Sequence, residues 1–350
     1  MSLTTGCGAD RSAYDERAAQ LRAELAADPS LTELVRYATL APNSHNTQPW
    51  RFQLSTNEIT ILPDFSRRTP AVDPDDHHLY VSLGCAAENL AIAAHARGRP
   101  SRVVTVETNM DGEDARAIKV SLGNGPAQNA SLCEAIPMRQ STRSEYDGRA
   151  LSADDLILLK DATSFPGVTA VFLTDGPKLE DTLEFVVAGN SRQMDTPEFV
   201  DELMAWIRFS HEAALRTGDG LSGPCSGNPS APDWLGKRFF HMAFKKPTEN
   251  DKYAKQIRSS AGVVVFIADK DGPEGWIRVG RSFERFALQA TLLGIQHAHI
   301  NQPIEVPEVR SGFADWLGMT GRRPNLVIRF GNAPMMPMSL RRPTKDVILV

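Results

Sequence analysis

Two long helical segments, one in each half of the chain, constrain the fold more than any other feature. LYVSLGCAAENLAIAAHARG (residues 79–98) and WIRVGRSFERFALQATLLG (276–294) both carry Ala and Leu along one side, end in Gly and are followed at some distance by a short Val-rich strand. A glycine after the last periodic residue is a common helix terminator. Because helices this apolar belong in a core, one in each half indicates two equivalent helices packed about a pseudo-twofold axis.

The segments around these helices read as a mixed α+β chain. Apolar periodicity predicts further helices, and Val/Ile-rich alternation predicts strands. The predicted helices cover residues 31–40, 153–162, 178–189 and 197–215. The predicted strands cover residues 50–54, 58–63, 101–108, 117–122, 168–174, 261–269 and 325–330. We therefore expect a first half over residues 1–130 and a second half over residues 131–350.

A segment of unusual composition lies at about 217–250 in the second half. It is dense in Gly, Pro, Ser and Asn but also contains Trp234, Phe239, Phe240 and Phe244. Long loops in compact domains are usually functional, so the segment is interpreted as a lid or pocket wall. The alternative is a structural excursion that packs on the outside of the core.

Composition and charge exclude several classes of protein. A formal net charge of -5 gives no reason to expect nucleic acid, because phosphate binding usually requires a basic excess. No stretch approaches the roughly 20 apolar residues that span a bilayer. The opening MSLTTGCGADRSAYDE lacks the apolar region of a secretory signal, so a cytoplasmic protein is expected.

The sequence also disfavours metal, disulfide, nucleotide-fold and hydrolase chemistry. Its four cysteines are widely separated without a CxxC pair, and neither His77-His78 nor His297-Ala298-His299 has zinc-ligand spacing. There is no GxGxxG, Walker loop or GxSxG elbow. The sequence therefore predicts no metal site and no catalytic nucleophile.

Three polar segments are candidates for a binding site. APNSHNTQPW (41–50) exposes amides and hydroxyls that can read the edge of a polar heterocycle, although it can equally be a capped helix end before a strand. In MRQSTRSEY (138–146), two arginines four residues apart can converge on one phosphate, although a solvated basic turn is the alternative. SLRRP (339–343) is basic, and its alternative is an inconsequential C-terminal extension.

Taken together, these segments resemble the nitroreductase family. APNSHNTQPWRF is similar to the loop that contacts the flavin from one subunit, and MRQSTRSEY resembles the Arg-x-Ser-x-Arg/Lys motif that grips the FMN phosphate from the other. SLRRPTKDVI resembles the C-terminal basic segment, and LLGIQHAHINQPIEVPEVR resembles the segment that passes over the flavin ring. The resemblance implies FMN as cofactor and an FMN site made of Pro42, Asn43, Ser44, Asn46, Arg139, Gln140, Ser141, Arg143, Gln302, Pro303, Ile304, Glu305, Arg341 and Arg342.

The order of the segments is asymmetric. The loop lies in the first half, whereas the arginine motif, the PIE segment and the basic tail lie in the second; SRQMDTPEF (191–199) occupies the place of a second loop without its character. This tandem layout is similar to the Acg family of FMN-binding nitroreductase-like proteins. It implies a fused pseudo-dimer with one FMN at the junction of its halves. Tyr146 stands three residues after Arg143 rather than two, which leaves its role open.

The resemblance implies an oxidoreductase in which the flavin carries electrons from a small donor to an acceptor such as a nitroaromatic or quinone. Flavin reduction by hydride requires no titrating side chain, and the sequence singles out no catalytic residue. A flavin-sequestering protein, whose aromatic lid excludes a nicotinamide donor, is the alternative. The fused chain is expected to be a monomer or a weak homo-oligomer, because a pseudo-dimer already buries the surface that drives family dimerisation.

Overall fold

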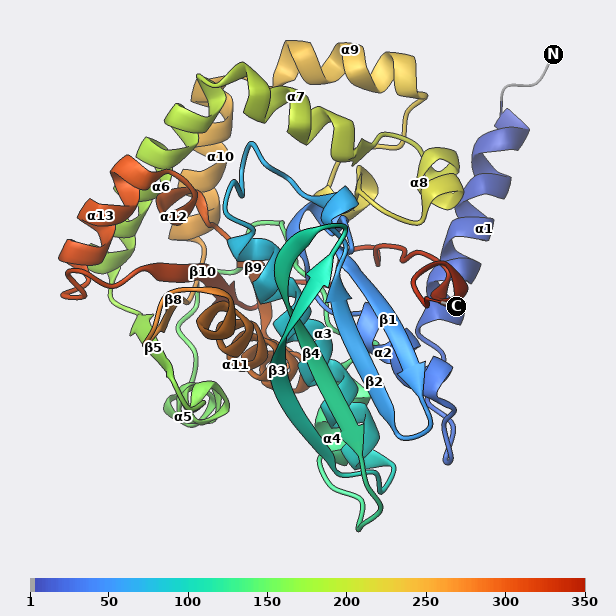
Figure 1. The fold of residues 1–350 in the computed structure, drawn as a ribbon. Helices are drawn as coiled ribbons and strands as arrows, with labels where there is room; N and C mark the ends of the chain where they lie inside the picture. Colours follow the sequence, from blue (N-terminus) through green and yellow to red (C-terminus); the bar gives the residue numbers. More distant parts are fainter. Residues whose placement is uncertain (1–3, 350) are drawn as a thin grey trace.

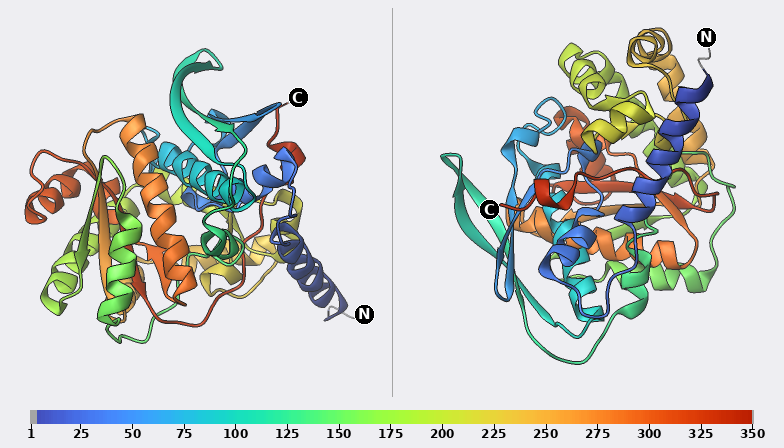
Figure 2. Two further views of the ribbon diagram at one scale, coloured as in Figure 1. Left: turned by 90° about the horizontal axis from the view of Figure 1, so that it is seen from below. Right: turned by 90° about the vertical axis from the view of Figure 1, so that its right-hand side faces the viewer.

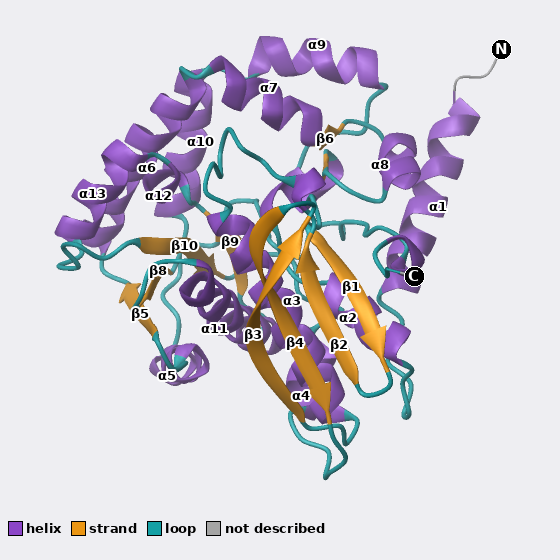
Figure 3. Cartoon of the chain, viewed as in Figure 1, coloured by secondary structure: helices purple, strands orange, loops and turns teal. Residues whose placement is uncertain are grey.

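The computed structural model describes the backbone of residues 4–349 and, within that range, the side chains from residue 10 onward (Figures 1 and 3). The first half contains α1 (Thr4–Leu21), α2 (Leu31–Thr39), β1 (Trp50–Ser55), β2 (Glu58–Pro63), α3 (His77–Ala96), β3 (Ser101–Met110) and β4 (Glu113–Leu122). The second half begins with α4 (Ala130–Ala135), α5 (Ala153–Thr163), β5 (Val168–Leu173), α6 (Gly176–Met194), α7 (Pro197–Trp206), β6 (Ile207–Arg208), α8 (His211–Thr217) and β7 (Leu221–Ser222). It continues with α9 (Asp233–Ala243), α10 (Lys246–Arg258), β8 (Gly262–Ala268), α11 (Pro273–Leu292), β9 (Gln296–His299), α12 (Gln302–Glu305), α13 (Pro307–Trp316) and β10 (Pro324–Gly331).

The two halves share one connectivity. Each contains a four-stranded antiparallel sheet, with strand order β1-β2-β4-β3 in the first and β5-β8-β10-β9 in the second. In each half a helix precedes the first strand, and a long helix, α3 or α11, links the second strand to the third. The structure therefore confirms the expected α+β fold of two pseudo-symmetric halves.

The long helices α3 and α11 cross at a pair of glycines. A Cβ atom on Gly84 would lie less than 3.0 Å from the carbonyl of Ile277, and one on Gly280 would lie as close to the carbonyl of Val81. Only glycine permits this approach of two backbones. Since 81 and 277 differ by the same 196 positions as 84 and 280, the crossing is the centre of the repeat.

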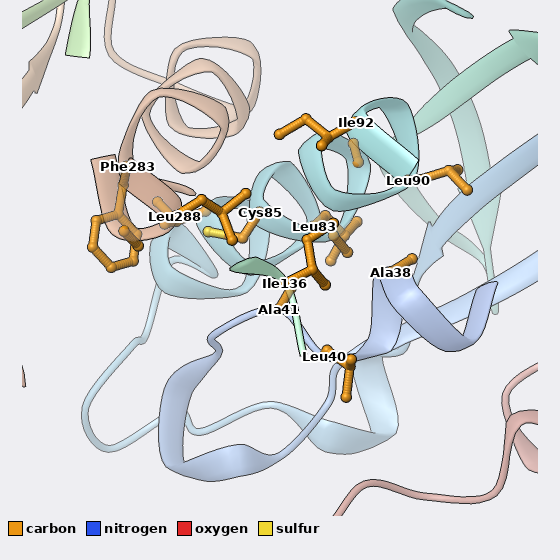
Figure 4. Packing of buried hydrophobic residues seen from close by; sticks show 14 of the residues in the cluster. Ala38, Leu40, Ala41, Leu83, Cys85, Leu90, Ile92, Ile136, Phe283 and Leu288 are labelled. Atoms are coloured by element: carbon orange, nitrogen blue, oxygen red, sulfur yellow. The ribbon is translucent and has the colours of Figure 1, made fainter. Parts of the chain in front are cut away.

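The same offset extends along both helices. GCAAENLAIAAHARG (84–98) and GRSFERFALQATLLG (280–294) carry identical residues at the paired positions Glu88/Glu284, Ala91/Ala287, Ala94/Ala290 and Gly98/Gly294. Figure 4 shows part of the packing around these helices, with the side chains of α2, α3 and α11 directed into one common core. The two helices predicted from their apolar composition are thus the shared core of both halves.

Both ends of the chain cross to the other half (Figure 2). The N-terminal helix α1 packs against α8 of the second half. The C-terminal segment returns to the first sheet, where the N–H of Phe52 donates to Val347 O over 2.8 Å and the N–H of Leu349 donates to Phe52 O over 2.8 Å. The repeat itself divides between β4 and α5, but these crossings mean that neither half is separate in space.

A group of helices, α6 to α10, is inserted between β5 and β8 and forms the arc at the top of Figure 1. The first half has only a tight β1–β2 hairpin there, in which Ser55 pairs with Glu58. The expected single helix over 197–215 is wrong, because α7 ends at Trp206 and α8 starts at His211. The expected loop over 217–250 is also wrong in part, since it contains α9 and the start of α10.

The shared connectivity corrects one further expectation. Residues 191–199 do not take the place of a second flavin loop, because they join α6 to α7 inside the insertion. The position equivalent to the α2–β1 loop lies between α5 and β5, where only residues 164–167 intervene. Within residues 4–349, no helix combines the length and apolar character that crossing a membrane requires.

Candidate functional site

Two adjoining cavities lie where the α2–β1 loop of the first half meets the second half. The larger has a volume of about 220 Å³ and is lined by the loop, α3, α12 and the inserted helices. The smaller, of about 60 Å³, is lined by the loop, the arginine motif and the C-terminal tail. The two cavities adjoin, because they share four lining residues: Pro42, Asn43, Arg143 and Leu221.

The α2–β1 loop has a strained backbone. His45, Asn46 and Gln48 have φ angles of 46°, 54° and 56°, in the left-handed region that residues other than glycine seldom adopt. Such conformations cost on the order of 1 kcal/mol each and persist only when the surroundings hold them. The side chain of Asn43 supplies one restraint, because its Oδ1 accepts the Gln48 N–H over 2.7 Å.

The second half supplies the other restraints on this loop. Asn46 Nδ2 donates to Gly220 O over 3.0 Å and to Leu340 O over 3.2 Å. Gln48 Nε2 donates to Gly218 O over 2.9 Å. These amides therefore join the halves, while Asn46 Oδ1 is buried at the smaller cavity without a hydrogen-bond partner.

Two predicted arginines bind the C-terminal end of α2. Arg139 donates through Nη2 to Leu40 O over 2.7 Å, and Arg341 donates through Nε to Thr39 O over 2.7 Å and through Nη2 to Ala41 O over 3.2 Å. Cations at a helix C-terminus are stabilised by its unpaired carbonyls and its dipole. The two buried guanidiniums thus fix the loop's starting point and bring their charge to the smaller cavity.

Among the described residues, the guanidinium of the predicted Arg143 has no partner for any of its donors. Arg143 lines both cavities. Its side chain keeps accessible surface because it projects into the open space. Even so, the surrounding protein removes enough water that burial lowers the pKa of Arg143.

The smaller cavity contains two further donors that the motifs do not include. Arg22, which directly follows α1, lines it, and so does Ser222 of the short strand β7. The Ser222 Oγ is buried without a hydrogen-bond partner. Neither residue belongs to a recognisable motif, and only the docking of α1 and the insertion brings them here.

Positive charge dominates the smaller cavity. Arg22, Arg139, Arg143 and Arg341 all line it. Among the described residues, the one carboxylate within ion-pair distance of these four arginines is that of Glu284, which lies 3.5 Å from Arg139 Nε. Since burial raises the pKa of Glu284 to about 7, this carboxyl is only partly ionised at neutral pH. The cavity therefore has the electrostatics of an anion site.

Three of the predicted site residues, Arg342, Pro303 and Ile304, do not line either cavity. The Arg342 guanidinium donates to Gln48 O over 3.3 Å and to Asp346 O over 3.0 Å. Pro303 and Ile304 are buried behind the wall formed by Gln302 and Glu305. Pro42, Asn43 and Ser44 line the larger cavity, and Ser141 lines the smaller.

Gln140 also lines the smaller cavity but has a local partner. Its Nε2 donates to Met336 O over 2.9 Å, and its Oε1 accepts the Met336 N–H over 2.7 Å. This pair of hydrogen bonds to the backbone of Met336 ties the arginine motif to the C-terminal segment. The Gln140 amide is therefore committed to positioning.

The larger cavity contains a buried ion pair that the sequence did not indicate. His78 Nε2 lies 3.3 Å from Glu305 Oε1, and Glu305 Oε2 accepts from Gln193 Nε2 over 2.6 Å. Burial opposes the imidazolium, but the Glu305 hydrogen bond and the negative charge of Asp73 outweigh it and raise the pKa of His78. By contrast, burial lowers the pKa of His299 to about 3 and that of His45 to about 4.

Asp73, His77 and His78 have ligand atoms within 4.8 Å of one another. The Asp73 carboxylate, however, accepts the backbone N–H groups of His78 over 2.9 Å and Leu79 over 3.0 Å. Capping the start of α3 therefore accounts for this carboxylate. Nothing in the cluster calls for a metal ion.

The insertion forms one wall of the larger cavity. Phe199 and Leu203 of α7, together with Phe244 at the end of α9, line it. Trp234 and Phe239 do not, and they are 71% and 52% exposed. One of the four aromatic residues noted in the sequence thus reaches the cavity.

No family model matches the chain. The chain is similar to two proteins of Mycobacterium tuberculosis: "Putative NAD(P)H nitroreductase Rv3131", with 24% identity over 89% of this chain and 88% of the relative, and "Putative NAD(P)H nitroreductase acg", with 23% identity over 90% and 94%. Its fold is similar to that of a "putative nitroreductase" from Anabaena variabilis, with a TM-score of 0.50, 11% identity and 91% of each chain covered.

These similarities extend through both halves of the chain, so they include the tandem arrangement as well as the nitroreductase-like fold of each half. Similarity over about nine-tenths of its length and the shared fold therefore support an Acg-type nitroreductase-like protein.

Proposed function

We propose that the protein is an FMN-dependent, nitroreductase-like oxidoreductase that holds one FMN per chain across the two cavities. The observation that carries the proposal is the unpartnered Arg143 at the junction of an arginine-lined cavity with a larger, mixed cavity. A phosphate in the first and a flavin ring in the second give each space a chemically matched occupant. The names of the curated relatives, which are NAD(P)H nitroreductases, agree with this assignment.

The smaller cavity fits a single phosphate group. A water-sized group needs roughly 10–15 Å³ of such space, so about 60 Å³ holds four to six of them, which is comparable to the five heavy atoms of a phosphate. Arg143, Ser222 and Arg139 line it, and the Ser222 Oγ is buried without a hydrogen-bond partner.

The larger cavity fits a polar heterocycle. Pro42 and Phe283 offer apolar surface, and Gln302 Oε1 and His45 Nδ1 are buried there without hydrogen-bond partners. Unpaired buried polar atoms cost free energy unless a ligand meets them. The amide-rich edge and uncharged His45 and His299 therefore suit the ring's carbonyl and imide groups.

The pseudo-symmetric position favours a single site. Cys85 lines the larger cavity, and its counterpart 196 residues later is Arg281. The Arg281 guanidinium stacks 4.9 Å from the Phe165 ring, and its Nε lies 2.7 Å from Glu88. This ion pair at the position equivalent to Cys85 argues against a second flavin there.

When bound, the flavin supplies the electron-transfer chemistry, and the protein positions it. Arg143, Arg139 and Ser141 hold the phosphate, while the strained α2–β1 loop orients the ring edge. Phe199 and Leu203 of α7, together with Phe244, would exclude water from a flavin in the larger cavity. Buried His78 and partly buried Glu305 place a proton-carrying pair on the cavity wall.

A second function, flavin sequestration, is favoured by one observation. Phe199, Leu203 and Phe244 form a wall over the larger cavity, where a nicotinamide donor has to stack. If this wall stays closed, the protein holds FMN without turnover.

The visible spectrum of the purified protein, with identification of the molecule released on denaturation, tests the cofactor. A colourless protein that does not quench added FMN contradicts the proposal. Anaerobic stopped-flow mixing with NADH or NADPH then separates the two functions. Bleaching within seconds supports the oxidoreductase, whereas reduction by dithionite alone supports sequestration. Phe244→Ala, with Phe239→Ala as the exposed control from the same helix region, tests whether the wall limits donor access.

A further inference from the structure

The N-terminal helix α1 contributes to the smaller cavity from outside both predicted motifs. Tyr14 is 1% exposed, and its hydroxyl donates to Met338 O over 2.8 Å. One helical turn later, Ala18 packs into the same small cluster. Arg22 then follows the last residue of α1 and donates through Nη2 to Ser339 O over 2.9 Å. The docking of α1 thus determines whether Arg22 reaches the cavity.

The attachment of α1 is small. Its buried contacts belong to a cluster of five side chains, separate from the two larger cores, namely Tyr14, Ala18, Ala214, Cys225 and Leu340. Segments with few buried apolar contacts open at low free-energy cost, independently of the global fold. The position of α1 is therefore sensitive to modest changes in electrostatics.

Arg22 lies close to two other positive charges, those of Arg139 and Arg341. Burial, followed by the positive charge of Arg139, lowers the pKa of Arg22 to about 10. Burial, then Arg22 and Arg139, hold the pKa of Arg341 well below its usual range. Without an anion, this repulsion opposes the docking of α1. With an anion between the guanidiniums, the same charges stabilise it.

The cavity also has unsatisfied donors that face the anion position. Ser222 is 3% exposed with an unpartnered Oγ. Only two of the five Arg22 N–H groups have partners, Ala18 O and Ser339 O. Donors arriving from α1, β7 and the arginine motif converge from different directions, which suits a tetrahedral oxyanion.

We propose that Arg22 and Ser222 are phosphate-binding residues of the smaller cavity, and that phosphate binding is coupled to the docking of α1 through Arg22. The identity of the phosphate as that of FMN rests on the proposed function, but the coupling itself requires only a phosphate group. By linkage, whatever docks α1 tightens the binding of phosphate, and phosphate stabilises docked α1 by the same factor.

The test uses the full-length chain freed of bound small molecules, with inorganic phosphate and FMN as separate probes. Hydrogen–deuterium exchange of residues 10–21 reports the docking of α1. In the wild-type chain, saturating phosphate should slow this exchange at least tenfold. Arg22→Gln should weaken phosphate and FMN binding at least tenfold and abolish the phosphate effect on exchange. Arg11→Gln, in the same helix at an exposed position, is the matched control and should behave as wild type.

Two further variants separate the parts of the proposal. Ser222→Ala should weaken phosphate binding without changing exchange in the free chain. Tyr14 does not line the cavity, but Tyr14→Ala should still weaken phosphate binding, because the substitution disfavours the docking of α1. Wild-type affinities in Arg22→Gln, or exchange of α1 that ignores phosphate, would overturn the proposal even if the protein binds FMN. If phosphate binds with these effects but FMN does not, the coupling stands and the flavin assignment fails.

Discussion

Glu88 and Glu284 occupy equivalent positions of the repeat, both fully buried, and have opposite surroundings. Glu88 accepts from Arg281 Nε over 2.7 Å and from Arg285 Nε over 2.6 Å. Glu284 has no hydrogen bond to either oxygen and faces Arg139 at 3.5 Å. One carboxylate is therefore paired with two arginines, and the other lies beside Arg139 of the arginine-lined smaller cavity.

The raised pKa of Glu284 predicts a pH-dependent stability. Its pKa rises from 4.5 to about 7 on folding, so the folded chain binds more protons between these values and stability falls as pH increases through them. For the ligand-free protein, we expect Glu284→Gln to reduce the loss of unfolding free energy between pH 5 and pH 8 by on the order of 1–3 kcal/mol. Urea denaturation at both pH values measures it. An unchanged difference would show that Glu284 is ionised throughout.

The free guanidinium of Arg143 predicts a separation of binding from stability. Arg143→Gln removes a charge that makes no hydrogen bond or ion pair among the described residues, so the ligand-free chain should be about as stable as wild type. FMN binding should weaken by about 2–5 kcal/mol, which corresponds to roughly 30-fold or more. Flavin content after purification and fluorescence titration measure this loss.

Arg116→Gln, on the outer sheet and paired with Glu107, is the control and should retain flavin. Arg139→Gln should lose flavin as well, but it should also destabilise the chain because Leu40 O loses a partner. Equal flavin content in all three variants would contradict the site assignment.

The crossing of α3 and α11 predicts a strong steric effect. Gly84→Ala places a methyl group against the Ile277 backbone, and Gly280→Ala does the same at Val81. Overpacking of this kind costs about 3 kcal/mol, against the roughly 1 kcal/mol that Ala contributes as a better helix former. Thermal or urea unfolding provides the measurement. Gly176→Ala, where a Cβ meets nothing within 4 Å, should not destabilise the chain.

The pair of His78 and Glu305 predicts a change in the pKa of the imidazole. Glu305→Gln removes the carboxylate that stabilises the imidazolium, so the pKa of His78 should fall. Asp73 remains as a weaker source of negative charge. NMR titration of the His78 ring gives the answer directly. A pKa that stays in place would mean that Asp73 alone stabilises the charge.

The stability contribution of His78 follows from the same shift. Because its folded-state pKa is raised, the pair stabilises the protein below the unfolded value of about 6.5, and this contribution is lost as pH rises through the folded pKa. Glu305→Gln should remove this part of the pH dependence. Gln193→Ala, which leaves the carboxylate in place, should affect it less.

Local sequence determined most of the regular structure. Periodicity placed the two core helices and the strands around them because these patterns depend on neighbouring residues and on burial alone. It also identified the α2–β1 loop and the Arg139–Arg143 segment, whose residue types are unusual in combination. The helices of the insertion were harder to predict from the sequence. Helix α9 contains a glycine, follows a proline and has exposed aromatic residues, and these features mask its helical periodicity.

Tertiary structure decided which polar residues meet. Arg22 and Ser222 lie 200 positions apart and belong to no motif, yet both line the smaller cavity. Arg341 and Arg342 are adjacent in sequence, but one reaches α2 and the cavity while the other turns to Gln48 and the tail. The sequence alone predicted the two equivalent halves and three of the four arginines that line the smaller cavity. Which residues line that cavity was decided only by the crossing of the chain ends and by the packing of the insertion. The reason is that charged side chains meet according to their distances in space, which no local sequence pattern encodes.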